Sequence, residues 1–162
     1  MAVRPAVPSD EATLLQLDRV AWPAGTSFPS FRAQAWEQES FFDERDTPES
    51  HLVAELNGAV VGYVRMRPAN NVPEGAHVLG IFGLLVAESA RQLGIASALL
   101  TAAEEYARAH GGRKLILHVL ATNTAAQRLY QRHGYVVEGH NREAFLIDGA
   151  YVDDLLMAKP LI

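Results

Sequence analysis

The sequence predicts a single α/β domain with mixed strand pairing, and three observations carry that prediction. Hydrophobic periodicity arranges the 162 residues in the order βααβββαβαββ, with no internal repeat and no low-complexity segment. The dipeptide Asn57-Gly58 lies between two apolar segments and is typical of a type I′ hairpin turn. A strand at 77–86 is followed by a loop, a helix and a further strand, so helices and strands alternate in the second half.

Composition excludes several classes of protein. Hydrophobic residues make up 49% of the chain and charged residues 20%, which is typical of a folded globular domain. The chain has no Cys, so disulfides, thiolate metal ligands and a Cys nucleophile are excluded. The net charge of −5 disfavours nucleic acid as a partner and weakly favours a cationic partner such as an amine. Four histidines without metal-ligand spacing are expected at the surface, namely His51, His110, His133 and His140.

No segment has the features of a membrane span or a signal peptide. The longest apolar run, 78–87, is shorter than the roughly 18 residues that a membrane-spanning helix needs. Residues 1–5 lack the basic and apolar regions of a secretory signal. We therefore expect a cytoplasmic protein that does not associate with membranes.

The first half of the chain contains two helices before its hairpin. A short strand opens the chain, and Ser9 or Asp10 caps the helix that follows. The Pro-, Gly- and Ser-rich segment 22–30 breaks that helix, and a second helix covers about 31–43. Because segment 22–30 carries aromatic residues, it is either a mobile lid over a binding site or a connection whose aromatics hold the two helices together.

A hairpin and a buried strand come next. Segments 49–56 and 59–68 are the two hairpin strands on either side of the Asn-Gly turn. The strand at 77–86 is almost entirely apolar, which predicts a central strand buried on both faces. Gly80 and Gly83 inside it indicate a β-bulge or the close approach of another backbone.

The remaining elements are separated by glycine stop signals. A helix over about 94–110 ends at Gly111-Gly112, and a strand at 113–120 follows. A helix then runs from its cap at Asn123 to Gly134. Three strands complete the chain, at 135–138, 144–147 and 151–159, with a turn at Asp148-Gly149 between the last two.

The loop between the apolar strand and the next helix has the character of an anion site. The first amide groups of a helix have no intrahelical partners, and the helix dipole places about half a positive charge at that end. Gly94 and Ala96 carry little or no side chain, so a polyphosphate can approach the backbone closely. Neither a Walker A sequence nor a dinucleotide-binding Gly-x-Gly-x-x-Gly sequence occurs here. An ordinary connection between a strand and a helix is the alternative interpretation.

Two motifs together resemble a known family. The pattern Arg-x-x-Gly-x-Ala at 91–96 resembles the pyrophosphate loop of the GNAT superfamily, the acyl-CoA-dependent N-acetyltransferases. The pattern Asn-x-x-Ala-x-x-Leu-Tyr-x-x-x-Gly-Tyr at 123–135 closely resembles the segment after the fifth strand of that family. The resemblance covers about residue 77 to the end and, more loosely, the segment from Val3. It implies the GNAT fold over 1–162, a single α/β domain with one mixed, mostly antiparallel sheet of six to seven strands flanked by four helices.

The resemblance implies acetyl-CoA as the acyl donor and no metal. In this family the backbone of the fourth strand binds the pantetheine arm and polarises the acetyl carbonyl, a role that falls here to Leu84, Leu85 and Val86. The amides of the following loop bind the pyrophosphate, and Arg91 assists electrostatically. Those loop residues are Gln92, Leu93, Gly94, Ile95, Ala96 and Ser97. Asn123 binds the cofactor arm.

The family's reaction is a direct transfer, in which the amine attacks the thioester and an acid protonates the leaving thiolate. Tyr130 matches the position of this general acid; the alternative is a ring that only packs against the cofactor. His118 occupies the fifth-strand position where some peptide-acetylating relatives carry Glu. A histidine ordinarily has a pKa near about 6.5 and can deprotonate an amine near neutral pH. The alternatives are His77, Glu55, a water relay, or a His118 that is only a half-buried strand residue.

The sequence thus predicts an N-acetyltransferase that moves an acetyl group from acetyl-CoA to a primary amine of a small molecule or a peptide N-terminus. The pattern from Glu138 onward resembles members that act on small amines, amino acids or polyamines. The alternatives are a non-catalytic acyl-CoA-binding or sensor module of the same fold, and an enzyme with a different acyl donor. The resemblance also implies a homodimer. The acceptor is expected at segment 22–30, the turn near Asn70 and the last strands.

Overall fold

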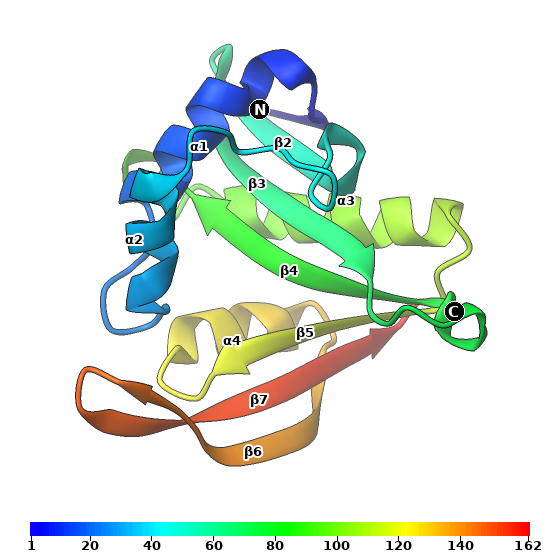
Figure 1. Cartoon of the computed structure of the whole chain (residues 1–162). Coiled ribbons are helices and arrows are strands. Elements are labelled where there is room, and N and C mark those ends of the chain that lie inside the picture. The colour runs from blue at the N-terminus through cyan, green and yellow to red at the C-terminus, as the bar shows by residue number, and fades with distance from the viewer. The chain divides into compact units, whose positions relative to one another are not determined.

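One mixed sheet of seven strands and four α-helices form the structure, a computed structural model that describes residues 1–162. Figure 1 shows the elements in chain order. They are β1 (Ala2–Pro5), α1 (Glu11–Val20), α2 (Pro29–Glu37), β2 (His51–Leu56), β3 (Ala59–Pro68), β4 (Val78–Val86), α3 (Ile95–Ala109), β5 (Lys114–Leu120), α4 (Thr124–Arg132), β6 (Val136–Ile147) and β7 (Ala150–Pro160). The strand order is β1-β2-β3-β4-β5-β7-β6, and β4 runs parallel to β5. This confirms the predicted fold class.

Two elements differ from the predictions. Helix α2 ends at Glu37 rather than near residue 43, because the N–H groups of Phe41 and Phe42 donate to the Glu11 carboxylate instead of to the backbone carbonyls that a continuing helix would use. The expected strands at 135–138 and 144–147 are one long strand, β6. A register shift against β7 between Asn141 and Phe145 absorbs the irregular residues.

The chain divides into two compact units. The first comprises residues 1–22, 30–66 and 83–103, and the second comprises residues 23–29, 67–82 and 104–162.

The core of the first unit is formed by α1 and the strands of the hairpin. Leu14 and Leu17 lie on one face of α1 and pack in a buried cluster with Val53 of β2, Tyr63 of β3 and Leu85 of β4. The turn between β2 and β3 has the left-handed backbone that its Asn-Gly sequence predicts, with φ of 53° and 80°. The Ala87 N–H donates to the Val61 carbonyl oxygen of β3 at 2.7 Å, so the hairpin holds the segment that leads into the candidate anion loop.

His51 corrects the expectation of a surface histidine, because it is fully buried in the first unit. Its Nδ1 donates to the Thr47 carbonyl oxygen at 2.8 Å, and its Nε2 accepts from Arg65 Nε at 2.9 Å. A carbonyl oxygen can only accept and an arginine Nε–H can only donate, so both partners select the neutral Nδ1–H tautomer. His51 is therefore a satisfied core residue.

An ion-pair network joins β1 to the start of α1 and to β2. The Arg4 guanidinium lies 2.8 Å from a carboxylate oxygen of Asp10 and 2.8 Å from one of Glu55. Its hydrogen bonds to Asp10 lower the pKa of that carboxyl, and the Val7 N–H adds to the same effect. A lowered folded-state pKa stabilises the fold above the unfolded pKa, about 3.9, and this stabilisation is lost as the pH falls through the folded value.

Replacing Arg4 with methionine is expected to lower the free energy of unfolding by about 1 kcal/mol at pH 7, because the two carboxylates lose a partly exposed ion pair. The difference from the wild type should shrink as the pH falls below about 4, because the stabilisation that comes from the lowered pKa of folded Asp10 is lost from there downward. Urea denaturation at pH 7 and pH 3 measures both values. Arg128→Met, on the exposed face of α4, is the control and should change stability by less than about 0.5 kcal/mol. An equal loss at both pH values for Arg4→Met would contradict the ionic origin.

The second unit is built on β5, β6 and β7, with the loop 23–29 attached. Phe28 packs against a small buried cluster of Leu120, Ile147 and Val152. Its ring also meets that of Phe145 edge to face, with centroids 4.7 Å apart. This contact holds segment 22–30 against the strands of the second unit rather than against the two helices, which neither interpretation of the segment predicted.

Candidate active site

The C-terminal part of β4 lies in the first unit. The Leu85 side chain is buried in the core cluster, whereas Leu84 and Val86 are half-buried. Gly62 of β3 permits a close approach, because a Cβ there would lie 2.8 Å from the carbonyl oxygen of Leu85. Gly83 allows a similar approach, since its Cβ would lie 3.4 Å from the Tyr63 ring. At Leu85, then, only the backbone could bind a ligand.

The loop after β4 has two residues with left-handed backbone, Gln92 with φ 63° and Gly94 with φ 78°. Helix α3 begins at Ile95, and the Ala98 N–H donates to the Gly94 carbonyl oxygen at 3.0 Å. The amides of residues 95 and 96 precede this first intrahelical bond, at the end of the helix where N–H groups point outward. A helix start of this kind is suited to an anion.

Arg91 is positioned by backbone carbonyls rather than by another side chain. Its Nε donates to the Val86 oxygen at 3.3 Å, and its Nη2 donates to the oxygen of Ala21, which follows α1. Arg91 thereby connects the loop to α1. Its electrostatic help to a pyrophosphate stays a prediction.

In the second unit, Asn123 caps α4 as the sequence predicts. Its Oδ1 accepts the Ala126 N–H at 3.1 Å. The Gln127 side-chain amide donates to the carbonyl oxygens of Leu120 and Ala121 at 3.2 and 3.0 Å, which secures the junction of β5 and α4.

Tyr130 is buried on the face of α4 that also carries Ala126 and Leu129. Its ring centroid lies 5.9 Å from that of Tyr135. Burial raises the pKa of the Tyr130 hydroxyl to about 12. The phenol is therefore neutral at physiological pH and can donate a hydrogen bond or a proton.

His118 lies on β5 with 55% of its side chain exposed. Its Nδ1 is 2.6 Å from Oδ2 of Asp154 on β7, a carboxylate that sequence reasoning missed. The two residues are diagonal neighbours, because Asp154 pairs with Leu120 and His118 pairs with Leu156. The pairing of β5 with β7 was the missing signal, since the two residues lie far apart in the sequence.

The other two candidate bases have different surroundings. Glu55 is held in the ion pair with Arg4. His77 is exposed and directly precedes β4, and its carbonyl oxygen accepts the Arg113 N–H at 2.8 Å. Of the three candidates, only His118 is an imidazole paired with a carboxylate, that of Asp154.

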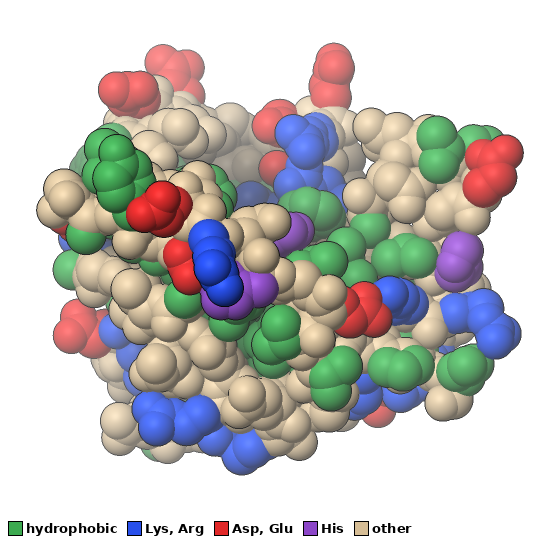
Figure 2. Space-filling view, turned by 90° about the horizontal axis from the view of Figure 1, so that it is seen from below, with side chains coloured by type: hydrophobic (Ala, Val, Ile, Leu, Met, Phe, Trp, Pro, Cys, Tyr) green, Lys and Arg blue, Asp and Glu red, His purple; other side chains and the backbone are tan.

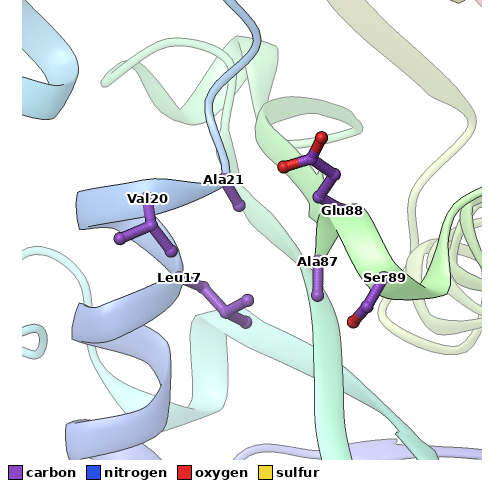
Figure 3. A pocket seen from close by; sticks show the side chains of 6 residues that line it. All are labelled: Leu17, Val20, Ala21, Ala87, Glu88 and Ser89. Atoms are coloured by element: carbon purple, nitrogen blue, oxygen red, sulfur yellow. The ribbon is translucent and has the colours of Figure 1, made fainter.

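The first unit also contains an open pocket of about 480 Å³ beside the end of β4. Figure 3 shows its two sides. The end of α1 contributes Leu17, Val20 and Ala21, and the segment after β4 contributes Ala87, Glu88 and Ser89. Glu88 is the single charged group in an otherwise mainly apolar lining, which suits a small ligand with an ammonium group and an aliphatic part.

The structure has neither a metal-binding cluster nor a membrane-spanning helix. No group of three or more His, Asp or Glu side chains is arranged to hold a metal ion. None of the helices is long and apolar enough to span a membrane.

Comparisons with known proteins agree with these features. A model described as "Acetyltransferase (GNAT) family" matches residues 12–135, which include both motifs. The chain is 30% identical to the uncharacterized N-acetyltransferase YhfO of Bacillus subtilis over 142 residues, covering 83% of this chain and 89% of YhfO. It is also 30% identical to the L-amino acid N-acetyltransferase AaaT of Escherichia coli over 112 residues, covering 67% and 66% of the two chains. Several other curated relatives are longer, and the chain covers 28% to 56% of their length.

A solved structure resembles the whole chain. The crystal structure of smu.2055 from Streptococcus mutans superposes with a TM-score of 0.84 at 26% sequence identity, covering 100% of both chains. The structural similarity therefore covers the whole chain and not only the two motifs.

Proposed function

We propose, because the chain belongs to the GNAT acetyltransferase family, that it transfers an acetyl group from acetyl-CoA directly to a primary amine of a small molecule or a peptide N-terminus. The observation that carries this proposal is the family match over residues 12–135, which includes the anion loop and Tyr130. The match extends over parts of both compact units, which supports a single N-acetyltransferase domain over 1–162.

The loop and the helix start supply the binding groups for acetyl-CoA. The amides of Gln92 to Ser97 bind the pyrophosphate, since the left-handed backbone at Gln92 and Gly94 belongs to a helix start suited to an anion. The backbone of Leu84 to Val86 binds the pantetheine arm and polarises the acetyl carbonyl. Asn123 binds the same arm, and Arg91 adds a positive charge beside the loop.

The chemistry needs one base and one acid. His118 Nε2 takes a proton from the substrate ammonium, and the free amine attacks the carbonyl carbon of the thioester. The new C–N bond forms as the C–S bond breaks, and the leaving sulfur takes its proton from Tyr130. The second proton that the nitrogen loses as it becomes an amide restores the Tyr130 hydroxyl. The raised pKa of Tyr130 keeps that proton in place until the thiolate develops.

A small cationic amine is the proposed acceptor class. The pocket beside Glu88 offers an aliphatic lining and one carboxylate, and the chain as a whole carries a net charge of −5. The relative AaaT acts on L-amino acids, which are small primary amines. The proposal includes a homodimer, and the family resemblance is what supports it.

Thermal unfolding with acetyl-CoA or CoA, followed by thiol release with a panel of primary amines, tests the proposal. Acetyl-CoA at about 100 times its Kd stabilises by roughly 2.7 kcal/mol, which is a shift of several degrees in Tm. Release of the CoA thiol only when an amine is present would show that the acetyl group moves to that amine. A shift without release for any amine would favour the sensor alternative, and a shift only with a longer acyl-CoA would favour a different donor.

A further inference from the structure

Strand β7 carries two adjacent aspartates, and each binds a histidine of a neighbouring strand. Asp154 Oδ2 lies 2.6 Å from His118 Nδ1 on β5, and Asp153 Oδ2 lies 2.7 Å from His140 Nε2 on β6. Successive residues of a strand point to opposite faces, so the two pairs lie on opposite faces of the sheet. Figure 2 shows histidine side chains at the surface on the side of β6 and β7.

The two pairs differ in burial. The Asp154 side chain is 8% exposed, while that of its partner His118 is 55% exposed. Asp153 is more accessible at 33%, and its carboxylate also accepts the Glu143 N–H at 2.8 Å. Asp153 is therefore part of the bend in the β6–β7 hairpin, whereas Asp154 is a desolvated carboxylate directed at one imidazole.

This geometry determines which nitrogen of His118 carries the proton. A carboxylate only accepts hydrogen bonds, so Nδ1 must be the N–H donor to Asp154. In the neutral ring the lone pair is then on Nε2, at the exposed end of the side chain. A base needs that combination of a nitrogen lone pair and a fixed ring orientation.

We propose that Asp154 is the positioning residue that makes His118 the base of the reaction, an inference that rests on the proposed function. The substrate ammonium transfers its proton to His118 Nε2, and the amine lone pair then forms the bond to the acetyl carbon. The resulting imidazolium is stabilised by the Asp154 carboxylate, which is little screened because it is buried. Asp154 does not touch the substrate.

The tautomer can be measured without any substrate. Nitrogen-15 NMR of the wild-type protein should show His118 with its proton on Nδ1. Asp154→Asn should lose this preference, because an amide can donate as well as accept. Asp153→Asn, the same change on the neighbouring residue, should leave His118 unaltered. A wild-type His118 with its proton on Nε2 would overturn the inference, whatever the enzyme acetylates.

Kinetics test the consequence for catalysis. Asp154→Asn should lower kcat about 100-fold while the KM values for acetyl-CoA and amine change less than about twofold. His118→Gln should lose at least as much, and the double variant should be no slower than His118→Gln, because Asp154 acts only through His118. Asp153→Asn is the activity control.

The outcomes separate the two proposals. Additive losses in the double variant, or a kcat for Asp154→Asn within twofold of the wild type, would overturn the role of Asp154 and leave the acetyltransferase intact. A wild-type protein that shows the expected tautomer but acetylates no amine would instead contradict the proposed function. Asp154→Ala provides a second variant should Asp154→Asn fold poorly.

Discussion

The variant Gly94→Val is expected to lose acetyl-CoA binding, with Kd at least about 100-fold weaker. Gly94 has φ 78°, a left-handed conformation that costs a residue with a Cβ about 1–2 kcal/mol. The space around the position of its Cβ is open, so valine would occupy the approach to the loop amides. Hydrogen bonds to a charged group contribute about 1.5–3 kcal/mol each, and losing two of them explains a change of this size. Calorimetric titration with acetyl-CoA measures it.

Gly111 provides the matched control for that experiment. It has φ 79° and likewise no neighbour near its Cβ position, but it follows the opposite end of α3. Gly111→Val should therefore lower the unfolding free energy about as much as Gly94→Val, through the same backbone strain. Its Kd for acetyl-CoA should equal that of the wild type. Equal losses of binding in both variants would mean that stability, and not the phosphate loop, explains the result.

The variant Tyr130→Phe is expected to lower kcat about 100-fold with an unchanged Kd for acetyl-CoA. Phenylalanine keeps the packing of the ring against Tyr135 and removes only the hydroxyl. With a pKa raised to about 12, that hydroxyl holds its proton until the thioester breaks and then donates to the sulfur. Single-turnover measurements of CoA release isolate this step.

Tyr135→Phe is the control for the acid. The Tyr135 hydroxyl is buried without a hydrogen-bond partner, and burial raises its pKa as well. Removing an unsatisfied buried hydroxyl should leave the protein as stable as the wild type or more stable, and kcat should not change. If Tyr135→Phe rather than Tyr130→Phe slowed CoA release, the assignment of the acid from the helix motif would be wrong.

Features that depend on a few consecutive residues could be predicted from the sequence. Asn57-Gly58 and Asp148-Gly149 each formed the expected left-handed turn, because few other residues adopt positive φ at low cost. The cap at Asn123 was predicted for the same reason, since its partner lies three residues along the chain. Both motifs were recognisable because a phosphate loop and a capped helix are short, continuous segments.

Features that depend on strand register or on burial could not be predicted in this way. His51 resembled a surface histidine, because its hydrogen bonds to Thr47 and Arg65 form only in the packed structure. The contact of the Arg91 side chain with the Ala21 carbonyl oxygen had no signal in the sequence, and the help of Arg91 to a phosphate stays a prediction. The partners in these contacts lie on separate elements, whose relative placement depends on the packed core.

The sequence by itself determined the order of helices and strands, the turns and the family, because each is encoded by local patterns. Only the tertiary structure decided that His118 has a carboxylate partner. The register of β5 against β7 places Asp154 opposite Leu120 and so beside His118. A shift of that register by one residue would turn Asp154 to the other face, so the pair depends on the packing that fixes the register.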